Sequence, residues 1–333
     1  FDNNKVPEEF KINPKYSICE IKEVRELNIF YRILKNIFKN TALYNYLPLY
    51  RDEIISDQIK NLKLDIIHFP ITTIDLPYEL PKSCKVILTF HDLQHVFFPE
   101  NFSKAELAQR DINYYQSLKI ADKVISISNY TKTTLIDRYS IASDKITVIY
   151  EGISKKYQNL FNEKDLIKVK EKYNLPDGFI YYPANPWPHK NHLNLLKAIL
   201  IIDKKYDLKI PVVFTGCIKG NEGILKNISA EINFPDSLIY DLGFIDEKDM
   251  PYIYCLAKIM VYPSLFEGFG IPILESMKIG CPVVCSNVSS LPEVGGNAAK
   301  YINPHDISDI SKKIYSLYKD DKEIHRLKTL GNN

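Results

Sequence analysis

The chain has 333 residues, of which 45% are hydrophobic and 25% charged, and its formal net charge is +2. A single core stops growing at roughly 250–300 residues, so this length favours two domains. The small net charge, with acidic and basic residues well mixed, excludes a strongly basic nucleic-acid surface, and we expect no nucleic-acid partner. No apolar run approaches the ~20 residues of a membrane-spanning helix.

Short apolar runs rich in Val, Ile and Tyr recur along the chain and predict strands that are buried on both faces of parallel sheets. They cover residues 64–69, 85–90, 123–128, 146–150, 178–183, 211–216, 238–243, 258–264 and 282–287. Segments of helical length lie between them, at residues 103–121, 192–206, 223–232 and 246–257, and Ser103 and Glu106 have the spacing of a capping box. This alternation predicts α/β layers with right-handed crossovers.

The alternation breaks once, in the polar, Lys-rich residues 151–178, which end in the turn signal Pro-Asp-Gly. We place the domain boundary there and predict a first domain over residues 1–155 and a second over residues 156–333. Both would be Rossmann-like, doubly wound parallel sheets that face each other across a central cleft. In such sheets ligands bind at the carboxyl ends of the strands.

Polar residues follow several of the predicted strands at these ends. His91 follows the run 85–90, His189 and Lys190 follow the run 178–183, and Gly216 ends the run 211–216. All of them therefore point to one cleft. Taken alone, Lys190 also fits a solvated lysine, and His91 fits a packed or helix-capping histidine.

No metal site is predicted. None of the six cysteines has the CxxC spacing of a zinc or redox site. His91 and His95 have HxxxH spacing, but the zinc-protease motif needs a glutamate after the first histidine and a helix beneath both. Here Asp92 follows, and the pair comes after a strand.

The stretch SLFEGFGIPILESM, residues 264–277, places one carboxylate before a glycine-rich turn and a second after it. Pro272 suits the first turn of a helix, and Gly280 suits its end, so we predict a helix over residues 271–279. At about 100° per residue, Glu275 falls on the apolar side of this helix, between Ile271 and Ile279. A buried carboxylate needs a partner, and the hydroxyl groups of a ligand would provide one.

Glu267 directly precedes the start of this helix. The backbone N–H groups of Gly268, Phe269 and Gly270 would line that start, where the helix dipole favours an anion. The stretch then suits a phosphate between two hydroxyl-binding carboxylates, as in a sugar nucleotide. In the alternative interpretation, Glu267 only interacts with the helix dipole and Glu275 pairs with Lys278.

Residues 262–306 resemble the E-x7-E region of the family 4 retaining glycosyltransferases, which have GT-B architecture. Residues 181–198 are similar to the segment that opens the C-terminal domain of that family, and residues 88–103 and 121–141 resemble parts of its N-terminal domain. The likeness covers about residues 66–319. It is closest to branches that act on bacterial surface polysaccharides, many of them mannosyltransferases.

The resemblance implies a retaining glycosyltransferase that moves a hexose, mannose-like in the favoured case, from a nucleotide diphosphate sugar. The acceptor would be a glycan or a lipid-linked glycan in the synthesis of a polysaccharide such as lipopolysaccharide. No cofactor is implied, and no metal is needed if protein groups supply the positive charge. We expect a cytoplasmic protein, with peripheral contact at the inner membrane if the acceptor is lipid-linked. Residues 22–38 are the one candidate for that contact, and ordinary helix packing is favoured there.

The resemblance also implies roles for individual residues. Glu267 would hold hydroxyl groups of the donor sugar, and Glu275 would bind the ribose. Lys190 would neutralise the diphosphate, and His91 would face the transferred sugar across the cleft. Further donor contacts would come from His189, Gly216, Gly268, Phe269 and Gly270.

The chain departs from the family pattern in two ways. Many members carry an arginine about five residues before the lysine, where this chain has Asn185, so His189 or backbone amides would share the phosphate charge. Residues 1–60 contain no glycine, so we expect the first strand and the Gly-rich turn of the family to be missing, as well as its last, returning helix.

These departures leave open a non-catalytic sugar-nucleotide-binding protein of the same fold. A glycoside hydrolase with Glu267 and Glu275 as its acid and nucleophile is a further alternative. It fits less well, because a hydrolase needs no phosphate cradle.

Overall fold

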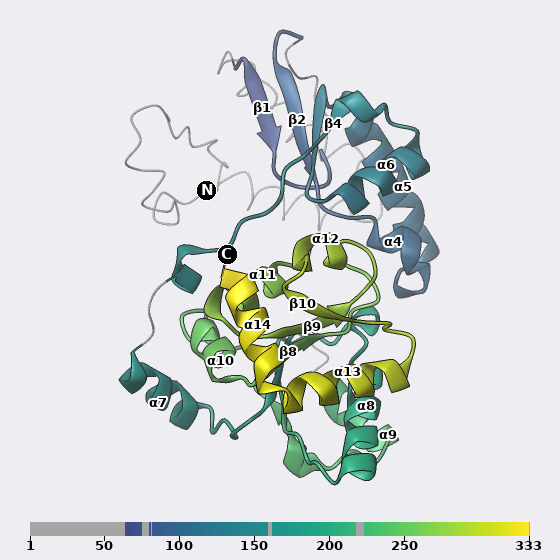
Figure 1. Cartoon of the computed structure of the whole chain (residues 1–333). Helices are drawn as coiled ribbons and strands as arrows, with labels where there is room; N and C mark the ends of the chain where they lie inside the picture. Colours follow the sequence, from purple (N-terminus) through teal and green to yellow (C-terminus); the bar gives the residue numbers. More distant parts are fainter. Residues whose placement is uncertain (1–63, 75–79, 81, 159–161, 218–222, 333) are drawn as a thin grey trace, which may run out of the picture.

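The computed structural model describes residues 64–74, 80, 82–158, 162–217 and 223–332. The missing first strand and glycine-rich turn expected at residues 1–60, and the helix packing expected of residues 22–38, lie outside these residues. The described chain forms two parallel β-sheets, each with helices packed against it and each with its own hydrophobic core (Figure 1). The two-domain α/β architecture is confirmed.

The first sheet runs in the order β1-β2-β3-β4, and every pair of neighbours is parallel. Its strands are β1 (Ile66–Phe69), β2 (Lys85–Phe90), β3 (Lys123–Ser126) and β4 (Ile146–Val148). The helices around it are α4 (Gln94–Phe97), η3 (Pro99–Asn101), α5 (Lys104–Ile120), α6 (Asn129–Tyr139) and η4 (Ser143–Lys145). The capping box predicted for α5 is present: Ser103 Oγ accepts from the Glu106 N–H, and the Glu106 carboxylate accepts from the Ser103 N–H.

The second sheet runs in the order β10-β9-β8-β5-β6-β7 and is also parallel throughout. Its strands are β5 (Ile180–Pro183), β6 (Val212–Thr215), β7 (Ile239–Asp241), β8 (Ile259–Tyr262), β9 (Val283–Ser286) and β10 (Ala299–Ile302). The chain enters at β5, builds one side of the sheet as far as β7, and then crosses back to β8. The strand order therefore reverses between β5 and β8, and this switch point is where open α/β sheets bind ligands.

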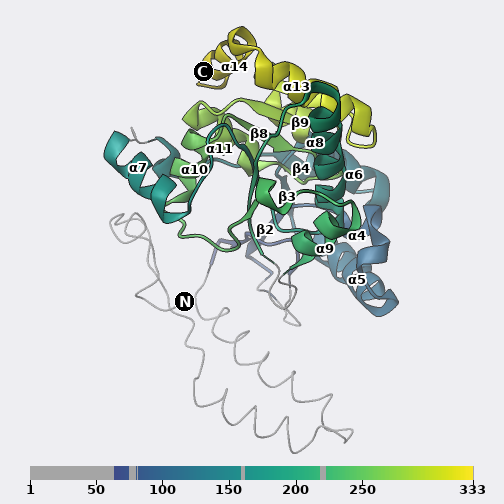
Figure 2. The same ribbon diagram turned by 90° about the horizontal axis from the view of Figure 1, so that it is seen from below.

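Helices cover both faces of the second sheet (Figure 2). On one face α8 (His192–Tyr206) packs against α13 (Ile307–Lys319) and α9 (Ile224–Glu231). On the other face α11 (Ile271–Ile279) packs against α10 (Met250–Leu256), α12 (Leu291–Gly295) and α14 (Asp321–Asn332). With both faces covered, every residue of β6, β8 and β9 is buried, which explains why these strands are continuous apolar runs.

Each strand predicted from the apolar runs is present. The prediction missed β10, whose apolar ends enclose Lys300 and Tyr301 and which lies at the edge of the sheet. It also missed α7 (Glu163–Lys172) in the linker, where the Asn162 side chain caps the helix by accepting from the Asp165 N–H at 2.8 Å. Helix α7 is mostly polar because Val169 is the one residue that it buries.

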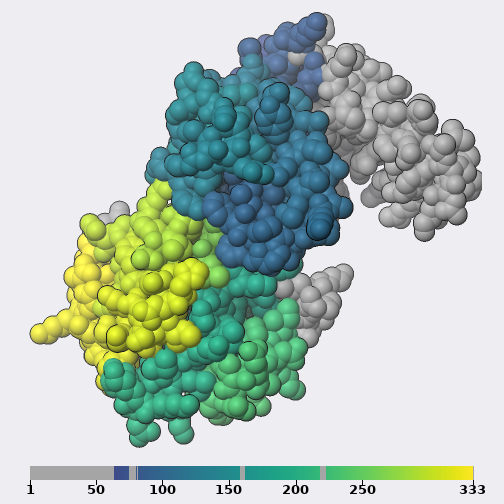
Figure 3. Space-filling view, turned by 90° about the vertical axis from the view of Figure 1, so that its right-hand side faces the viewer, coloured from purple at the N-terminus to yellow at the C-terminus, as the bar shows by residue number. Residues whose placement is uncertain are grey.

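The linker between β4 and β5 contains η5 (Lys155–Gln158), and the boundary predicted between residues 155 and 156 falls within it. The precise boundary stays a prediction. The first domain lies directly against the second (Figure 3). Within the described ranges, none of the helices has both the length and the hydropathy needed to cross a bilayer.

Candidate functional site

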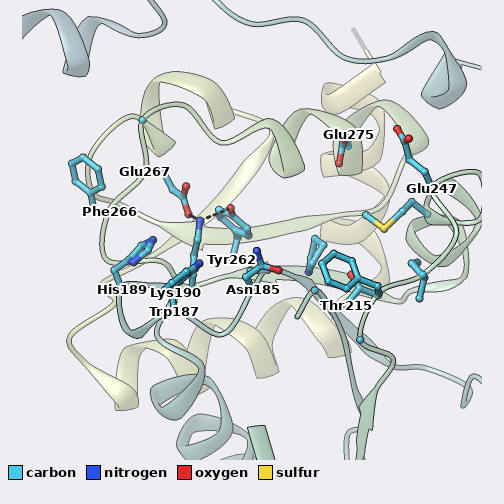
Figure 4. A pocket seen from close by; sticks show the side chains of 18 of the residues that line it. Asn185, Trp187, His189, Lys190, Thr215, Glu247, Tyr262, Phe266, Glu267 and Glu275 are labelled. Atoms are coloured by element: carbon cyan, nitrogen blue, oxygen red, sulfur yellow. Dashed lines mark hydrogen bonds and ion pairs between the residues drawn. The ribbon is translucent and has the colours of Figure 1, made fainter. Parts of the chain in front are cut away.

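A cavity of about 740 Å³ opens at the switch point of the second sheet, beyond the carboxyl ends of β5 and β8. Most of its lining comes from the second domain, and Asp92 and Gln94 of the first domain complete it. The cavity therefore lies between the domains. Figure 4 shows Lys190 and Glu267 pointing toward one another in this pocket, with Glu275 farther along the same wall.

Lys190 and Glu267 form an ion pair at the centre of the site, with 2.5 Å between Lys190 Nζ and Glu267 Oε1. Their side chains are only 15% and 12% exposed. Burial disfavours the charged lysine, but the neighbouring Glu267 carboxylate, together with Tyr182 and Asp92, raises the pKa of Lys190 above its usual value. Lys190 is therefore a largely buried, charged group, and the alternative of a solvated lysine is wrong.

This pair comes together because the loop after β5 is hydrogen-bonded to the loop after β8. Lys190 ends the short helix η6 (Pro188–Lys190), and Asn191 follows it in the left-handed conformation, at φ 64°. The Asn191 side chain donates to the main-chain oxygens of Pro263 and Pro304, at 3.0 and 2.8 Å. The Leu265 N–H donates to the His189 oxygen at 2.7 Å. The cation and the carboxylate therefore lie on two loops that are fixed to each other.

Glu275 lines the cavity and accepts a hydrogen bond from the Tyr254 hydroxyl at 2.9 Å. Burial raises its pKa, although hydrogen bonds from Tyr254 and Tyr157 act in the opposite direction. The proposed pairing with Lys278 is wrong, since Lys278 is exposed and Glu275 is held by tyrosines. A half-buried carboxylate with a raised pKa on a cavity wall is a typical ligand-binding group.

The expected orientation of α11 needs a correction. Its most buried residues are Ile273, Ser276 and Met277, on the side opposite Glu275, and not the face around Ile271 and Ile279. Glu275 is nevertheless half-buried because η5 and α10 cover the other side of the helix. The limits of α11 were predicted correctly, with Gly270 and Gly280 at its two ends.

The glycine-rich turn before α11 is shared between the cavity and the domain interface. Of its three residues, only Gly268 is in the cavity lining. Phe269 is buried and stacks on Tyr150 of the first domain, and Gly270 caps α11 at φ 115°. The structure therefore places Phe269 and Gly270 behind the lining, and a contact of their N–H groups with the donor stays a prediction.

Gly216 and Asn185 lie together in the lining of the cavity. Gly216 has φ 110°, and a β-carbon there would meet Asn185 Oδ1 at 2.7 Å. The same Oδ1 accepts from the Cys217 N–H at 2.9 Å. Asn185, at the position where many family members carry arginine, thus fastens the loop after β6 and brings no positive charge.

His189 is buried in the lining, and its Nδ1 lies 2.9 Å from Nε2 of Gln94 in the first domain. Burial, and then the positive charge of Lys190, lowers the pKa of His189 to about 4. His189 is therefore neutral at pH 7 in the free protein, and a share in binding the phosphate, which would then be through a hydrogen bond, stays a prediction. It remains able to donate or accept a hydrogen bond.

His91 lies beside the cavity and not in its lining, where its neighbour Asp92 is found. Its Nδ1 is 3.2 Å from Thr72 Oγ1, which fits the packed alternative. His95 instead packs on Tyr114 and lies 3.4 Å from Asp111, so the two histidines have different partners. In the part of the chain that the structure describes, no three His, Cys, Asp or Glu side chains are grouped as metal ligands would be.

Sequence reasoning missed several lining residues that carry no motif. Gln94 belongs to the first domain, and Tyr157 comes from the linker. Trp187 and Phe244 line the cavity and remain 43% and 78% exposed, so they offer apolar faces to a ligand. A strand-end position was the only signal for Trp187 and Phe244, and no local pattern indicated Tyr157.

Two family models match the chain. "Glycosyl transferases group 1" matches residues 163–333, and "Glycosyltransferase Family 4" matches residues 20–156. The O-antigen chain mannosyltransferase B of Escherichia coli is 32% identical over 247 residues, covering 74% of this chain and 64% of the relative. A serotype-specific mannosyltransferase WbdA of Escherichia coli is 29% identical, over 73% of this chain and 30% of that protein. The chain therefore spans less than two thirds of either relative.

Among solved structures, Anabaena Alr3699/HepE in complex with UDP and glucose matches with a TM-score of 0.66 and 17% identity. The match covers 87% of this chain and 77% of that one. At this identity the likeness concerns the fold alone, and it agrees with GT-B architecture.

Proposed function

The chain belongs to the glycosyl transferases group 1 family, and we propose that it transfers a hexose from a nucleotide diphosphate sugar to a glycan with retention of configuration. The observation that carries this proposal is the largely buried Lys190–Glu267 pair at the switch point of the second sheet. In this proposal Lys190 would bind the diphosphate and Glu267 the sugar hydroxyls, and the pair lines a cavity of about 740 Å³ that Glu275 also lines.

In the proposed reaction, the bond between C1 of the hexose and the diphosphate oxygen breaks, and its electron pair stays with the diphosphate. The acceptor hydroxyl forms the new bond to C1 on the same face of the sugar, and its proton passes to the departing phosphate. Negative charge on the leaving group grows along this path. Lys190 would stabilise that charge, and Glu267 would hold the sugar while its bond breaks.

The choice of transferred sugar and of acceptor is based on the relatives. Both mannosyltransferases named above support mannose as the favoured hexose, and the first supports a growing O-antigen chain as the acceptor. A role in lipopolysaccharide synthesis is part of the proposal. A lipid-linked acceptor would bring the chain to the cytoplasmic face of the inner membrane as a peripheral protein.

A panel of nucleotide sugars, measured for thermal shift and for turnover with glycan acceptors, tests this proposal. We expect one donor to raise the melting temperature and to be consumed when an acceptor is present. Binding without turnover would support the sugar-nucleotide-binding alternative. Release of sugar from a glycan without any nucleotide sugar would instead indicate a glycoside hydrolase.

We expect transfer to survive excess EDTA, with a rate within about twofold of the untreated enzyme. The physical reason is that Lys190 and the start of α11 would supply the positive charge that a metal provides in other enzymes. The measurement is turnover after EDTA treatment and dialysis, followed by addition of Mg²⁺, Mn²⁺ or Zn²⁺. Activity that EDTA abolishes and one of these ions restores would contradict metal independence.

Replacing Glu275 by glutamine should weaken donor binding by roughly ten- to a hundredfold, which corresponds to about 1.5–3 kcal/mol for hydrogen bonds to a charged group. Glu275 lies on the cavity wall, where it would bind the ribose hydroxyls. Calorimetric titration of the donor checks the affinity. An unchanged dissociation constant would remove Glu275 from the donor site.

The same variant should not lower the stability of the fold at pH 7. Burial raises the pKa of Glu275, so its ionisation is harder in the folded than in the unfolded state. The resulting penalty is absent below the unfolded pKa and grows as the pH rises through the folded pKa. Glutamine cannot ionise, so the melting temperature of Glu275→Gln should equal or exceed that of the wild type at pH 7 and approach it at pH 4.

A further inference from the structure

The first turn of α6 in the first domain is completed by a carboxylate from the second domain. Within its own domain, Ser128 caps α6 by accepting from the Thr131 N–H at 3.0 Å. Glu293, which lies in α12, accepts from the N–H groups of Asn129 and Tyr130 at 2.7 and 3.3 Å. It also accepts from the Asn129 side-chain amide at 2.7 Å. The first N–H groups of a helix have no partner within the helix, so a carboxylate is favourable here.

The same helix end holds the turn that lines the cavity. Ser128 Oγ donates to the Gly268 oxygen at 2.7 Å, and Thr131 Oγ1 lies 3.3 Å from that oxygen. Both side chains are fully buried. Gly268 is in the cavity lining and directly follows Glu267. The start of α6 therefore contacts both Glu293 and the turn that lines the cavity, so a change in one contact can affect the other.

Aromatic side chains surround these polar contacts and close the interface. Phe97 stacks on Phe266 with 4.7 Å between ring centroids, and Tyr130 meets the edge of the same ring at 6.0 Å. On the other side of the turn, Tyr150 stacks on Phe269 at 5.9 Å. These contacts favour closure but are less directional than hydrogen bonds, and the Glu293 carboxylate accepts three of the hydrogen bonds that cross the boundary.

We propose that Glu293 is a positioning residue, a latch that holds the two domains closed over the cavity by capping α6 across the domain boundary. This inference rests on the proposed function, because closure matters for activity only if the first domain completes the site. In the closed state, Gln94 and Asp92 of the first domain join the cavity lining and Gln94 reaches His189. In an open state, the Asn129 and Tyr130 N–H groups would be solvated and those contacts would be lost.

Two substitutions on opposite sides of the boundary test the latch. Glu293→Gln removes the charge from the second domain. Asn129→Asp removes a donor from the first domain and places a second carboxylate within hydrogen-bonding range of Glu293. An acidic residue is favourable in the first turn of a helix, so Asn129→Asp should leave α6 itself intact. A defect common to both variants would therefore arise from the contact between the domains.

Asp306→Asn is the matched control. Asp306 caps α13 by accepting from the Ser308 and Asp309 N–H groups at 2.8 and 3.1 Å, entirely within the second domain. This change also removes a carboxylate from a helix start. It should reduce thermal stability without moving one domain relative to the other.

The experiment combines small-angle X-ray scattering of the free protein with steady-state kinetics. We expect Glu293→Gln and Asn129→Asp to increase the radius of gyration and to lower kcat about tenfold. The donor dissociation constant should change less than threefold, because the second domain supplies most of the cavity. The tenfold fall in kcat corresponds to the low end of the range for losing a hydrogen bond to a charged group. We take the low end because Asn129 is exposed. Asp306→Asn should match the wild type in all three quantities.

Scattering profiles and kcat values equal to those of the wild type in both variants would overturn the latch. A fall in thermal stability alone, as expected for the Asp306→Asn control, would also overturn the latch. If the wild type shows no transfer with any donor, the proposed function fails, but the radius of gyration still decides whether Glu293 holds the domains closed.

Discussion

Replacing Lys190 by alanine should lower kcat by about a hundred- to thousandfold, the effect of removing a comparable electrostatic donor. Donor affinity should fall much less. Lys190 is a largely buried, charged group that forms an ion pair with Glu267 in the free protein. The negative charge on the leaving diphosphate grows as the sugar departs, so the interaction with Lys190 is strongest in the transition state. Losing such an interaction lowers the rate more than the ground-state affinity.

The measurement is kcat together with the donor dissociation constant, for Lys190→Ala beside Lys190→Arg and His189→Ala. Arginine keeps the charge and should recover part of the rate. His189 is neutral at pH 7, so His189→Ala should cost less than Lys190→Ala. A near-normal kcat for Lys190→Ala together with loss of activity in His189→Ala would show that the phosphate charge is assigned to the wrong residue.

Replacing Gly268 by alanine should reduce kcat/KM by roughly a hundredfold, the order expected when catalytic groups move by about 1 Å. A β-carbon at Gly268 would lie 2.5 Å from the main-chain oxygen of His91 and 3.0 Å from the Asp92 side chain. The first contact is with backbone and cannot be relieved by a side-chain rotation. The two domains, or the turn that carries Glu267, must therefore shift.

Gly152→Ala is the matched control, because a β-carbon at Gly152 would meet no atom within 4 Å. This glycine lies in the linker, and its replacement should leave kcat/KM within about twofold of the wild type. Circular dichroism melting of both variants separates a local shift from unfolding. A Gly268→Ala protein with wild-type kinetics would show that the contact between Gly268 and His91 is not needed for activity.

The sequence alone predicted much of the second domain. Its strands are buried on both faces, so each reads as a continuous apolar run, and α11 carries its own start and stop signals in Pro272 and Gly280. The strand-end rule then selected Lys190, Glu267 and Gly216, which the structure places in the lining of one cavity. Strand β10 was missed because an edge strand interrupted by Lys300 and Tyr301 lacks that continuous pattern.

Local patterns could not determine what each site residue contacts. Helical periodicity placed Glu275 on an apolar face, whereas the structure shows it on the side covered by η5 and α10, held by Tyr254. A helical wheel describes one helix and contains no information on how many neighbours cover it. In the same way, the sequence placed His189 and Lys190 side by side at one strand end, and only their surroundings in the fold distinguish them. Burial lowers the pKa of His189, whereas the Glu267 carboxylate helps to raise the pKa of Lys190.

The sequence by itself determined the α/β class, the division into two domains and the residues at the strand ends, because burial on both faces and chain direction leave a local pattern. Only the tertiary structure decided the ion pair of Lys190 with Glu267, the place of Gln94 in the cavity and the cap of α6 by Glu293. These contacts join residues that are 77, 95 and 164 positions apart. Such pairs depend on the strand order and on the packing of one domain on the other. Neither can be predicted from the residues adjacent in the sequence.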